Sequence, residues 1–564
     1  MQRSKTCEPL CRRTYKNTNK KDISKYNKIV MAIRKDYMHH WILDNLPIVE
    51  CTSNCKGGIR PEDQPYYRLG FPVGCAIGAA EKSLTACTLR NINNMYQNEM
   101  FINNHVDIII RYHESPEFEG ARVVGVEVQP RSIRHESPDA LDCSPNRPPQ
   151  PFKLKMPTKD ATEEETLDLI FTYGVYFEES DIKWASRWDT YLRSAEGVSI
   201  QWFSIINSLV IVLFLSGMLG IILVRTLYKD IARYNQAEDR EDAQEEFGWK
   251  LIHGDVFRTP TNPLMLSVLV GSGVQFTCMV VITLFFACLG FLSPATRGGL
   301  MTAMVTLWVC LGTPSGYVSA RMYKMFGGEK WKTNTIMTAT FVPGVVFGLF
   351  FILNLLLWAE HSSAALPFGT LVVLAVLWFF ISVPLTFVGA YFGYKKATLE
   401  HPVRKNHIPR QIPPQPLYTR TLPAILMGGI LPFGCIFIQL FFILTSIWGH
   451  KLYYVFGFLF LVFLILVVTT IESTILLCYF HLCSENYHWW WRAFLTGGAS
   501  AIYLLIYEII FYFRQMEVDG KANLFLYLGY STIASFLFFL MTGTFGFVGC
   551  FYFVRRIYAV IKVD

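Results

Sequence analysis

Residues 201–224, QWFSIINSLVIVLFLSGMLGIILV, decide how this chain is organised. Trp202 and Phe203 begin the stretch, and Arg225 and Lys229 follow it. At about 1.5 Å per residue, a helix of this length crosses the roughly 30 Å hydrocarbon core of a bilayer. The sequence therefore predicts a first transmembrane helix here, with a polar headpiece before it and a mainly apolar chain after it.

The composition favours a membrane protein. Of the 564 residues, 52% are hydrophobic and only 17% are charged, and the aromatic share is 15%. Such a balance suits a chain whose side chains face lipid, so membrane lipids are expected partners. The formal net charge is +7, without the clustered basic and aromatic residues of a nucleic-acid-binding surface. Nucleic acid is therefore excluded as a partner.

Eight further apolar segments are each long enough to span a bilayer. They are 264–292, 299–320, 335–358, 368–394, 422–448, 453–480, 492–513 and 524–553. With residues 201–224 they predict an α-helical bundle of nine transmembrane spans. Lys and Arg concentrate in alternate connections, and the positive-inside rule then places the headpiece in the lumen and the C-terminus in the cytosol.

The predicted domain organisation follows from this topology. It consists of a lumenal β-rich domain, the first transmembrane helix, a charged cytosolic connector with a solvated surface, an eight-span membrane domain and a cytosolic tail. Their ranges are 1–200, 201–224, 225–263, 264–556 and 557–564.

The headpiece has the alternating pattern of β-strands at 105–112, 122–128 and 167–177. These strands predict a sandwich-like fold. Residues 1–28 are basic and polar and are expected to be poorly ordered, whereas 29–46 is a predicted helix.

Seven cysteines precede the first span, which suggests disulfides in an oxidising lumen with one thiol unpaired. They are Cys7, Cys11, Cys51, Cys55, Cys75, Cys87 and Cys143. Residues 1–35 contain no apolar signal segment, so insertion is expected to depend on the first span, or a preceding segment is missing.

Three predicted spans contain pairs of glycines four residues apart. Such spacing lets helix backbones approach closely, which favours packing where lipid removes the hydrophobic driving force. The pairs are Gly312 with Gly316, Gly344 with Gly348, and Gly389 with Gly393. Prolines in the same spans indicate kinks, which are common in membrane bundles and also occur in the broken helices of transporters.

Two carboxylates, Glu472 and Glu508, lie deep in apolar segments. An ionisable side chain there costs at least about 2.5 kcal/mol, so each is a candidate for ion or proton transport. An interhelical hydrogen bond is the structural alternative, with Gln439 or Gln275 as possible partners.

Cys478, His481, Cys483 and His488 have side chains that suit zinc, but their spacing is not that of a zinc finger. The adjacent Trp489–Trp491 row is typical of a membrane-interface belt. We expect no metal and no other cofactor. No catalytic motif stands out either, so the sequence does not predict an enzyme.

Several motifs resemble those of the nonaspanins, the transmembrane nine superfamily, and the resemblance runs from about Cys7 to Asp564. The motifs are GWK (248–250), HGDVFR (253–258), FGGEKW (326–331), IPRQIP (408–413) and GILPFG (429–434). The resemblance implies a non-enzymatic protein of Golgi and endosomes that sorts other membrane proteins, including those with glycine-rich spans. It also implies influence on Golgi glycosylation, adhesion and phagocytosis.

The resemblance further assigns the C-terminus. Lys562, Val563 and Asp564 match the family's Lys-x-Asp/Glu signal, which the COPI coat binds. Family members begin with a signal peptide and a longer lumenal segment, so the headpiece is expected to be N-terminally shortened.

Three functional hypotheses follow from the sequence. The first is a sorting or escort protein that works by lateral helix packing and is recycled through its tail. The second is a secondary transporter or channel that uses Glu472 and Glu508. The third is a receptor whose headpiece binds a lumenal ligand.

Overall fold

The chain forms two compact units, residues 1–200 with 294–297 and the remainder, and each is described by itself. The computed structural model describes residues 4–16, 19–53, 66–76, 100–116, 120–135, 141, 143, 151–154, 166–188, 191, scattered positions from 206 to 228, 248–289, 291, 298–362, 365–416, 419–448, 456–515 and 521–560.

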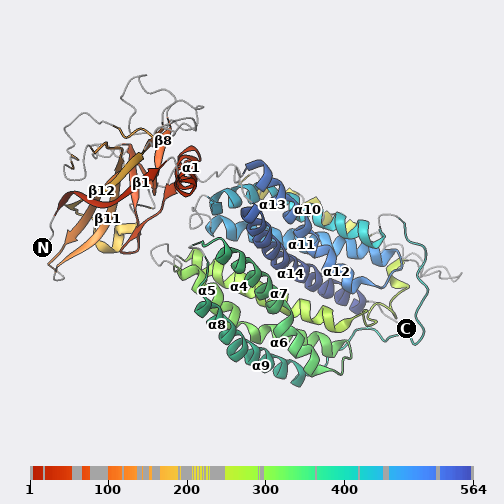
Figure 1. The fold of residues 1–564 in the computed structure, drawn as a ribbon. Coiled ribbons are helices and arrows are strands. Elements are labelled where there is room, and N and C mark those ends of the chain that lie inside the picture. Colours follow the sequence, from red (N-terminus) through yellow and green to blue (C-terminus); the bar gives the residue numbers. More distant parts are fainter. Residues whose placement is uncertain are drawn as a thin grey trace, which may run out of the picture. The chain divides into compact units, whose positions relative to one another are not determined.

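The first unit is built on a six-stranded mixed sheet with the strand order β1-β12-β10-β11-β5-β6 (Figure 1). β10 pairs in parallel with β12 and antiparallel with β11. Alternate residues of β11, Val124, Val126 and Val128, are at most 1% exposed, which explains the period of two in its sequence. The strands are β1 (Lys5–Lys16), β5 (Val49–Ser53), β6 (Tyr66–Leu69), β10 (His105–Glu114), β11 (Ala121–Arg131) and β12 (Thr166–Glu179).

The three strands predicted from alternation are confirmed as β10, β11 and β12. The sandwich is not what the described residues form. The helix α1 (Lys20–Arg34) packs Tyr26, Val30 and Ile33 against Leu169 of β12, and only two-stranded ribbons accompany it. Their strands are β2 (Met38–His39), β3 (Ile42–Leu43), β4 (Leu46–Pro47), β7 (Phe71–Pro72), β8 (Gly74–Ala76) and β9 (Met100–Ile102).

The prediction for the N-terminal region was wrong. Residues expected to be poorly ordered form β1, which pairs with β12 at positions from Thr166 to Val175, and the first part of α1. The predicted helix at 29–46 ends at Arg34, because Asp36 takes a positive φ of 48° and short strands follow. α1 begins earlier than predicted because the Asn19 side chain caps it by accepting from the Lys21 amide.

The second unit is helical, and each of the eight apolar segments predicted after residue 224 is formed mainly of one or more helices where it is described. The helices that follow the first span are α4 (Pro263–Cys288), α5 (Gly299–Cys310), α6 (Gly312–Met325), α7 (Trp331–Ala359), α8 (Phe368–Leu377), the π-helical turn η3 (Trp378–Ser382), α9 (Val383–Lys395), α10 (Thr421–Trp448), α11 (Phe456–Cys483), α12 (Trp489–Gly498), α13 (Ser500–Gln515) and α14 (Lys521–Val560). In Figure 1 they pass from green to blue in one bundle.

Among the described residues, six helical segments are long and apolar enough to cross a membrane. They are 263–288, 331–359, 368–395, 459–483, 489–514 and 522–559. The segment predicted at 299–320 is divided at Leu311 into α5 and α6, each below spanning length, and Pro314 stands in the first turn of α6. Half of the positions in the span at 201–224 are described, and all of these are helical.

The connector prediction was wrong for its final part. Trp249, Ile252 and Val256 are at most 6% exposed and belong to the main core of the helical unit, although a solvated surface was expected. The part of the connector before residue 248 lies outside the described residues, apart from helical positions at its start.

The tryptophan row holds this segment in place. Trp489 Nε1 donates to the Val256 carbonyl and Trp490 Nε1 to the Arg258 carbonyl, each at 2.9 Å. Both indoles are at most 2% exposed, so they do not form the predicted interface belt. An irregular buried segment needs partners for its backbone carbonyls, and the indole N–H groups provide them.

Candidate functional site

The glycine pairs of α6 and α9 meet where the two helices cross. A Cβ on Gly316 would lie 2.1 Å from the Thr386 carbonyl oxygen, and one on Gly389 would lie 2.0 Å from the Thr313 carbonyl oxygen. No side chain fits at such distances, so each helix places its glycines against the other's backbone. Gly312 and Gly393 make similar approaches, to Ser382 and Tyr317. All four glycines therefore pack against other residues of this chain.

The third pair, on α7, has a different environment. A Cβ on Gly348 would meet nothing within 4 Å, and one on Gly344 would meet only Trp378, at 3.6 Å. Gly348 lies on a helix face with Val345 and Ile352, whose side chains are 38% and 57% exposed. We call Gly344, Val345, Gly348 and Ile352 the open α7 face; among its two glycines only Gly344 has a described neighbour, Trp378.

The two intramembrane glutamates lie on different helices. Glu508 of α13 is 6% exposed and accepts a hydrogen bond from Ser535 Oγ of α14 at 3.2 Å. Glu472 of α11 has a buried Oε2 with no hydrogen-bond partner among the described residues. Among the described residues, the Glu508 carboxylate is bonded to α14 and not to Glu472, so the two glutamates are not joined by a hydrogen bond.

The sequence offered Gln275 and Gln439 as partners for the carboxylates, and the structure uses Gln275 elsewhere. Gln275 Nε2 donates to the Trp308 carbonyl at 2.7 Å, which ties α4 to α5. Gln439 is 2% exposed in α10 and has its own polar contact.

One residue of the cysteine and histidine cluster, His481, contacts a cation of α12. Arg492 Nη1 contacts His481 Nδ1 and lies 2.9 Å from His481 Nε2, and Nη2 contacts the Thr419 carbonyl. Since a guanidinium carries only donors, the histidine nitrogen accepts. Within the described residues, no group of three or more His, Cys, Asp or Glu side chains could hold a metal ion. Sequence reasoning missed this pair, because His481 and Arg492 meet only when α11 and α12 turn back on each other.

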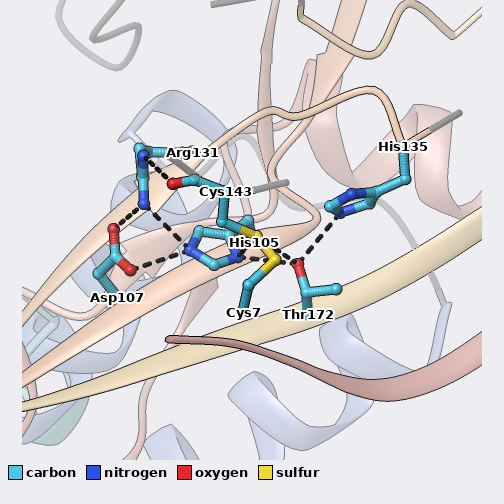
Figure 2. A network of polar contacts seen from close by, with 7 residues as sticks. All are labelled: Cys7, His105, Asp107, Arg131, His135, Cys143 and Thr172. Carbon is cyan, nitrogen blue, oxygen red and sulfur yellow. Dashed lines mark hydrogen bonds and ion pairs between the residues drawn. A yellow bond between two sulfur atoms is a disulfide. The ribbon is translucent and has the colours of Figure 1, made fainter. Parts of the chain in front are cut away.

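The headpiece contains a buried polar network that strand register creates. His105 of β10 pairs with Arg131 of β11 on one side and with Thr172 of β12 on the other. Its Nε2 lies 2.9 Å from Asp107 Oδ1, and its Nδ1 lies 2.8 Å from Thr172 Oγ1 (Figure 2). Arg131 forms an ion pair with Asp107.

Electrostatics keep the Asp107 carboxylate charged. Burial by itself would raise the pKa of Asp107, but the hydrogen bond from His105 and the charges of His105 and Arg131 outweigh it and hold the pKa below its usual value. Together with the covalent tie described next, these contacts indicate a structural role.

One disulfide ties β1 to this network. Cys7 of β1 is bonded to Cys143, whose sulfur lies 3.4 Å from His105 Nδ1 (Figure 2). Cys51 and Cys75 are also disulfide-bonded, whereas Cys11 is an exposed free thiol. Cys55 and Cys87 lie outside the described residues, as do Lys562, Val563 and Asp564 of the predicted sorting signal.

A β-rich unit followed by a bundle of long apolar helices defines a multi-pass membrane protein. Comparison with known proteins gives the family. The Endomembrane protein 70 family matches residues 1–521. The chain belongs to this family, the transmembrane 9 superfamily.

Curated relatives cover the whole chain. It is 55% identical over 566 residues to transmembrane 9 superfamily member 2 of Homo sapiens, covering 100% of this chain and 83% of that protein. It is 47% identical to member 10 of Arabidopsis thaliana and 44% identical to human member 4; each match covers all of this chain and 85% and 86% of the relative. No solved structure matches it.

The glycine crossing yields a stability prediction. Gly389→Ala places a methyl group against the Thr313 carbonyl and should destabilise the solubilised protein by about 2 kcal/mol. Gly348→Ala is the matched control and should be neutral, because its Cβ meets nothing. Thermal unfolding of both variants in detergent measures the difference. Equal transition temperatures would show that α6 and α9 do not cross at these glycines.

The headpiece network yields a pH prediction. Asp107→Asn should lower the free energy of unfolding at pH 7 by about 2 kcal/mol, because it leaves Arg131 without its buried counter-ion. The folded pKa of Asp107 is lowered, so its stabilisation is present above the unfolded pKa near 3.8 and is lost as pH falls through the folded pKa.

In urea titrations of the solubilised chain, the difference in free energy of unfolding between wild type and Asp107→Asn should therefore disappear only below about pH 4. Asp168→Asn is the control. Asp168 also pairs with an arginine, but its side chain is 40% exposed, so its effect should be smaller. An Asp107→Asn gap that is unchanged at pH 3 would contradict the assignment.

Proposed function

We propose that this protein sorts or escorts other membrane proteins in the Golgi and endosomes, without catalysing a reaction, and that it is recycled through its C-terminal tail. The supporting observation is the open α7 face. Two of the three glycine pairs pack in the α6–α9 crossing, whereas the pair on α7 is left without a close helix neighbour: Gly348 meets nothing and Gly344 meets only Trp378. The family's description as endomembrane proteins agrees with this location.

Physical chemistry favours a transmembrane helix as the cargo. Between two lipid-exposed helices, association depends on van der Waals contact and close backbone approach, which small residues permit. A cargo span with its own glycines would fit against Gly344 and Gly348, and the exposed Val345 and Ile352 would pack beside it. Leucine at the two glycines would remove the close approach.

The orientation belongs to the same proposal. If α5 and α6 together make one crossing, the chain would have nine spans. The positive-inside rule would then place the headpiece in the lumen and the tail in the cytosol, where COPI binds. The lysines and arginines at the ends of α6, α9 and α14 would then face the cytosol.

Transport remains the second candidate because Glu472 Oε2 is buried without a hydrogen-bond partner among the described residues. The arrangement supports it less well. The carboxylate of Glu508 accepts a hydrogen bond from Ser535, which is the structural use of an intramembrane acid.

The open α7 face can be tested with a double variant. Gly344→Leu with Gly348→Leu should abolish co-purification of a reporter membrane protein with a glycine-containing span and should move that reporter out of the Golgi. Gly434→Leu, at another glycine with nothing within 4 Å, is the control and should leave both unchanged. Undiminished capture by the double variant would exclude this face as the cargo site.

The tail is tested by location. The full chain, tagged within a loop, should occupy the Golgi and endosomes, whereas Lys562→Ala with Asp564→Ala should move to later compartments or the cell surface. Imaging of both at steady state measures the change. If the two distributions coincide in the Golgi, the tail is not the determinant and retention by the spans is the better explanation.

A further inference from the structure

A cavity of about 310 Å³ lies where α10 begins, α11 ends and α12 begins. This volume is at the lower end of the range for small-molecule sites. Its inner wall is buried, since Thr474, Trp489 and Ala493 are at most 2% exposed. Nothing described above uses this space.

The cavity contains one cation. Arg492 lines it together with His481 and Thr419, and both of these partners are neutral acceptors: a ring nitrogen and a backbone carbonyl. Within the described residues, no Asp or Glu oxygen lies within 4.0 Å of Arg492, although Arg410 at the same end of the bundle does pair with Glu485. A partly buried cation without a counter-ion is costly, and an anion in the cavity would relieve that cost.

The rim of the cavity is apolar and faces outward. Met427 of α10 and Phe480 of α11 both line it, and they are 43% and 36% exposed. An exposed apolar residue on a membrane helix faces lipid. A ligand in this cavity would therefore place a negative group on Arg492 and extend an apolar part past Met427 and Phe480.

The floor of the cavity depends on a second close helix approach. A Cβ on Gly428 of α10 would lie 2.2 Å from Thr496 Cγ2 of α12, a residue that lines the cavity. The absence of a side chain at Gly428 thus lets α12 come near enough for Arg492 to reach both His481 and the Thr419 carbonyl.

We propose that this cavity binds the phosphate of an anionic glycerophospholipid, with Arg492 as the phosphate ligand and an acyl chain leaving between Met427 and Phe480. A guanidinium suits phosphate because it offers several donors in one plane. The apolar rim favours a lipid over a soluble phosphate. This site is independent of the open α7 face and of the tail.

The test is lipid retention by the purified full chain. Delipidated protein in nonionic detergent is mixed with dioleoyl phosphatidylglycerol, or with dioleoyl phosphatidylcholine, which has the same acyl chains but a zwitterionic headgroup. Native mass spectrometry counts the bound lipids. The wild type should retain one phosphatidylglycerol in preference to phosphatidylcholine, and Arg492→Gln should weaken that binding at least about tenfold.

Matched variants separate a binding role from a structural one. Arg492→Lys keeps the charge and should retain part of the binding. Arg420→Gln removes an exposed cation at the same end of the bundle and should bind as the wild type does. Met427→Trp fills the mouth of the cavity without touching Arg492 and should abolish binding, so the proposal remains testable if Arg492→Gln fails to fold.

Three results would overturn the proposal. Wild-type retention by Arg492→Gln or by Met427→Trp would remove the cavity as the site. An equal loss in Arg420→Gln would assign the binding to surface charge. Displacement of the lipid by millimolar sodium phosphate, with phosphate itself bound in its place, would make the ligand a soluble anion.

Discussion

Pairing of buried backbone groups is the constraint on which the helical unit depends. Residues 248–261 enter the core as an irregular segment whose carbonyls cannot all be paired by a regular ladder, and an unpaired buried carbonyl costs about 1–3 kcal/mol. Trp489 and Trp490 donate to two of these carbonyls, and Tyr558 Oη donates to a third, that of Trp249, at 2.6 Å. The connector thereby fixes the starts of α4 and α12 and the end of α14 relative to one another.

The same constraint explains how the helices pack. A regular helix pairs its own backbone N–H and C=O groups, so two helices in lipid stabilise each other mainly by van der Waals contact. Close contact between their backbones requires residues with small or no side chains. The α6–α9 crossing and the approach of Gly428 to α12 are two uses of this rule. Gly344 and Gly348 follow the same sequence pattern but have no such neighbour in the described chain. The glycine spacing indicates which helices another helix can approach closely. Which helix does so depends on the tertiary structure.

The extent to which the fold was predictable follows from the range of the interactions. Helices of the second unit and strands β10, β11 and β12 were predicted because their signals are local: long apolar runs and alternation. β1 was missed because its stability comes from pairing with β12 and from the Cys7–Cys143 bond, both of which join distant residues. The burial of the connector's final part was not predicted, because Trp249, Ile252 and Val256 are surrounded in the sequence by charged residues.

Candidate site residues were predictable by type but not by use. The sequence identifies Glu472, Glu508 and the glycine pairs, yet it cannot show that Ser535 is bonded to Glu508 or that two of the pairs face each other. Arg492 was not singled out from the sequence, and His481 was considered as a metal ligand. Their contact requires α11 and α12 to fold back through the turn at 484–488.

Intramembrane charge is handled differently at the three positions, and the difference has a physical basis. Glu508 has a hydroxyl donor on the neighbouring helix, which is the least costly way to hold a carboxyl in an apolar bundle. Glu472 keeps one oxygen buried without a partner among the described residues. Arg492 stands at the start of a helix beside an open cavity, where its charge is neither paired with a described carboxylate nor sealed from the exterior. Because no described carboxylate pairs with this cation, the proposed lipid phosphate would supply its negative partner, and the apolar rim of the cavity would take the lipid's acyl chain.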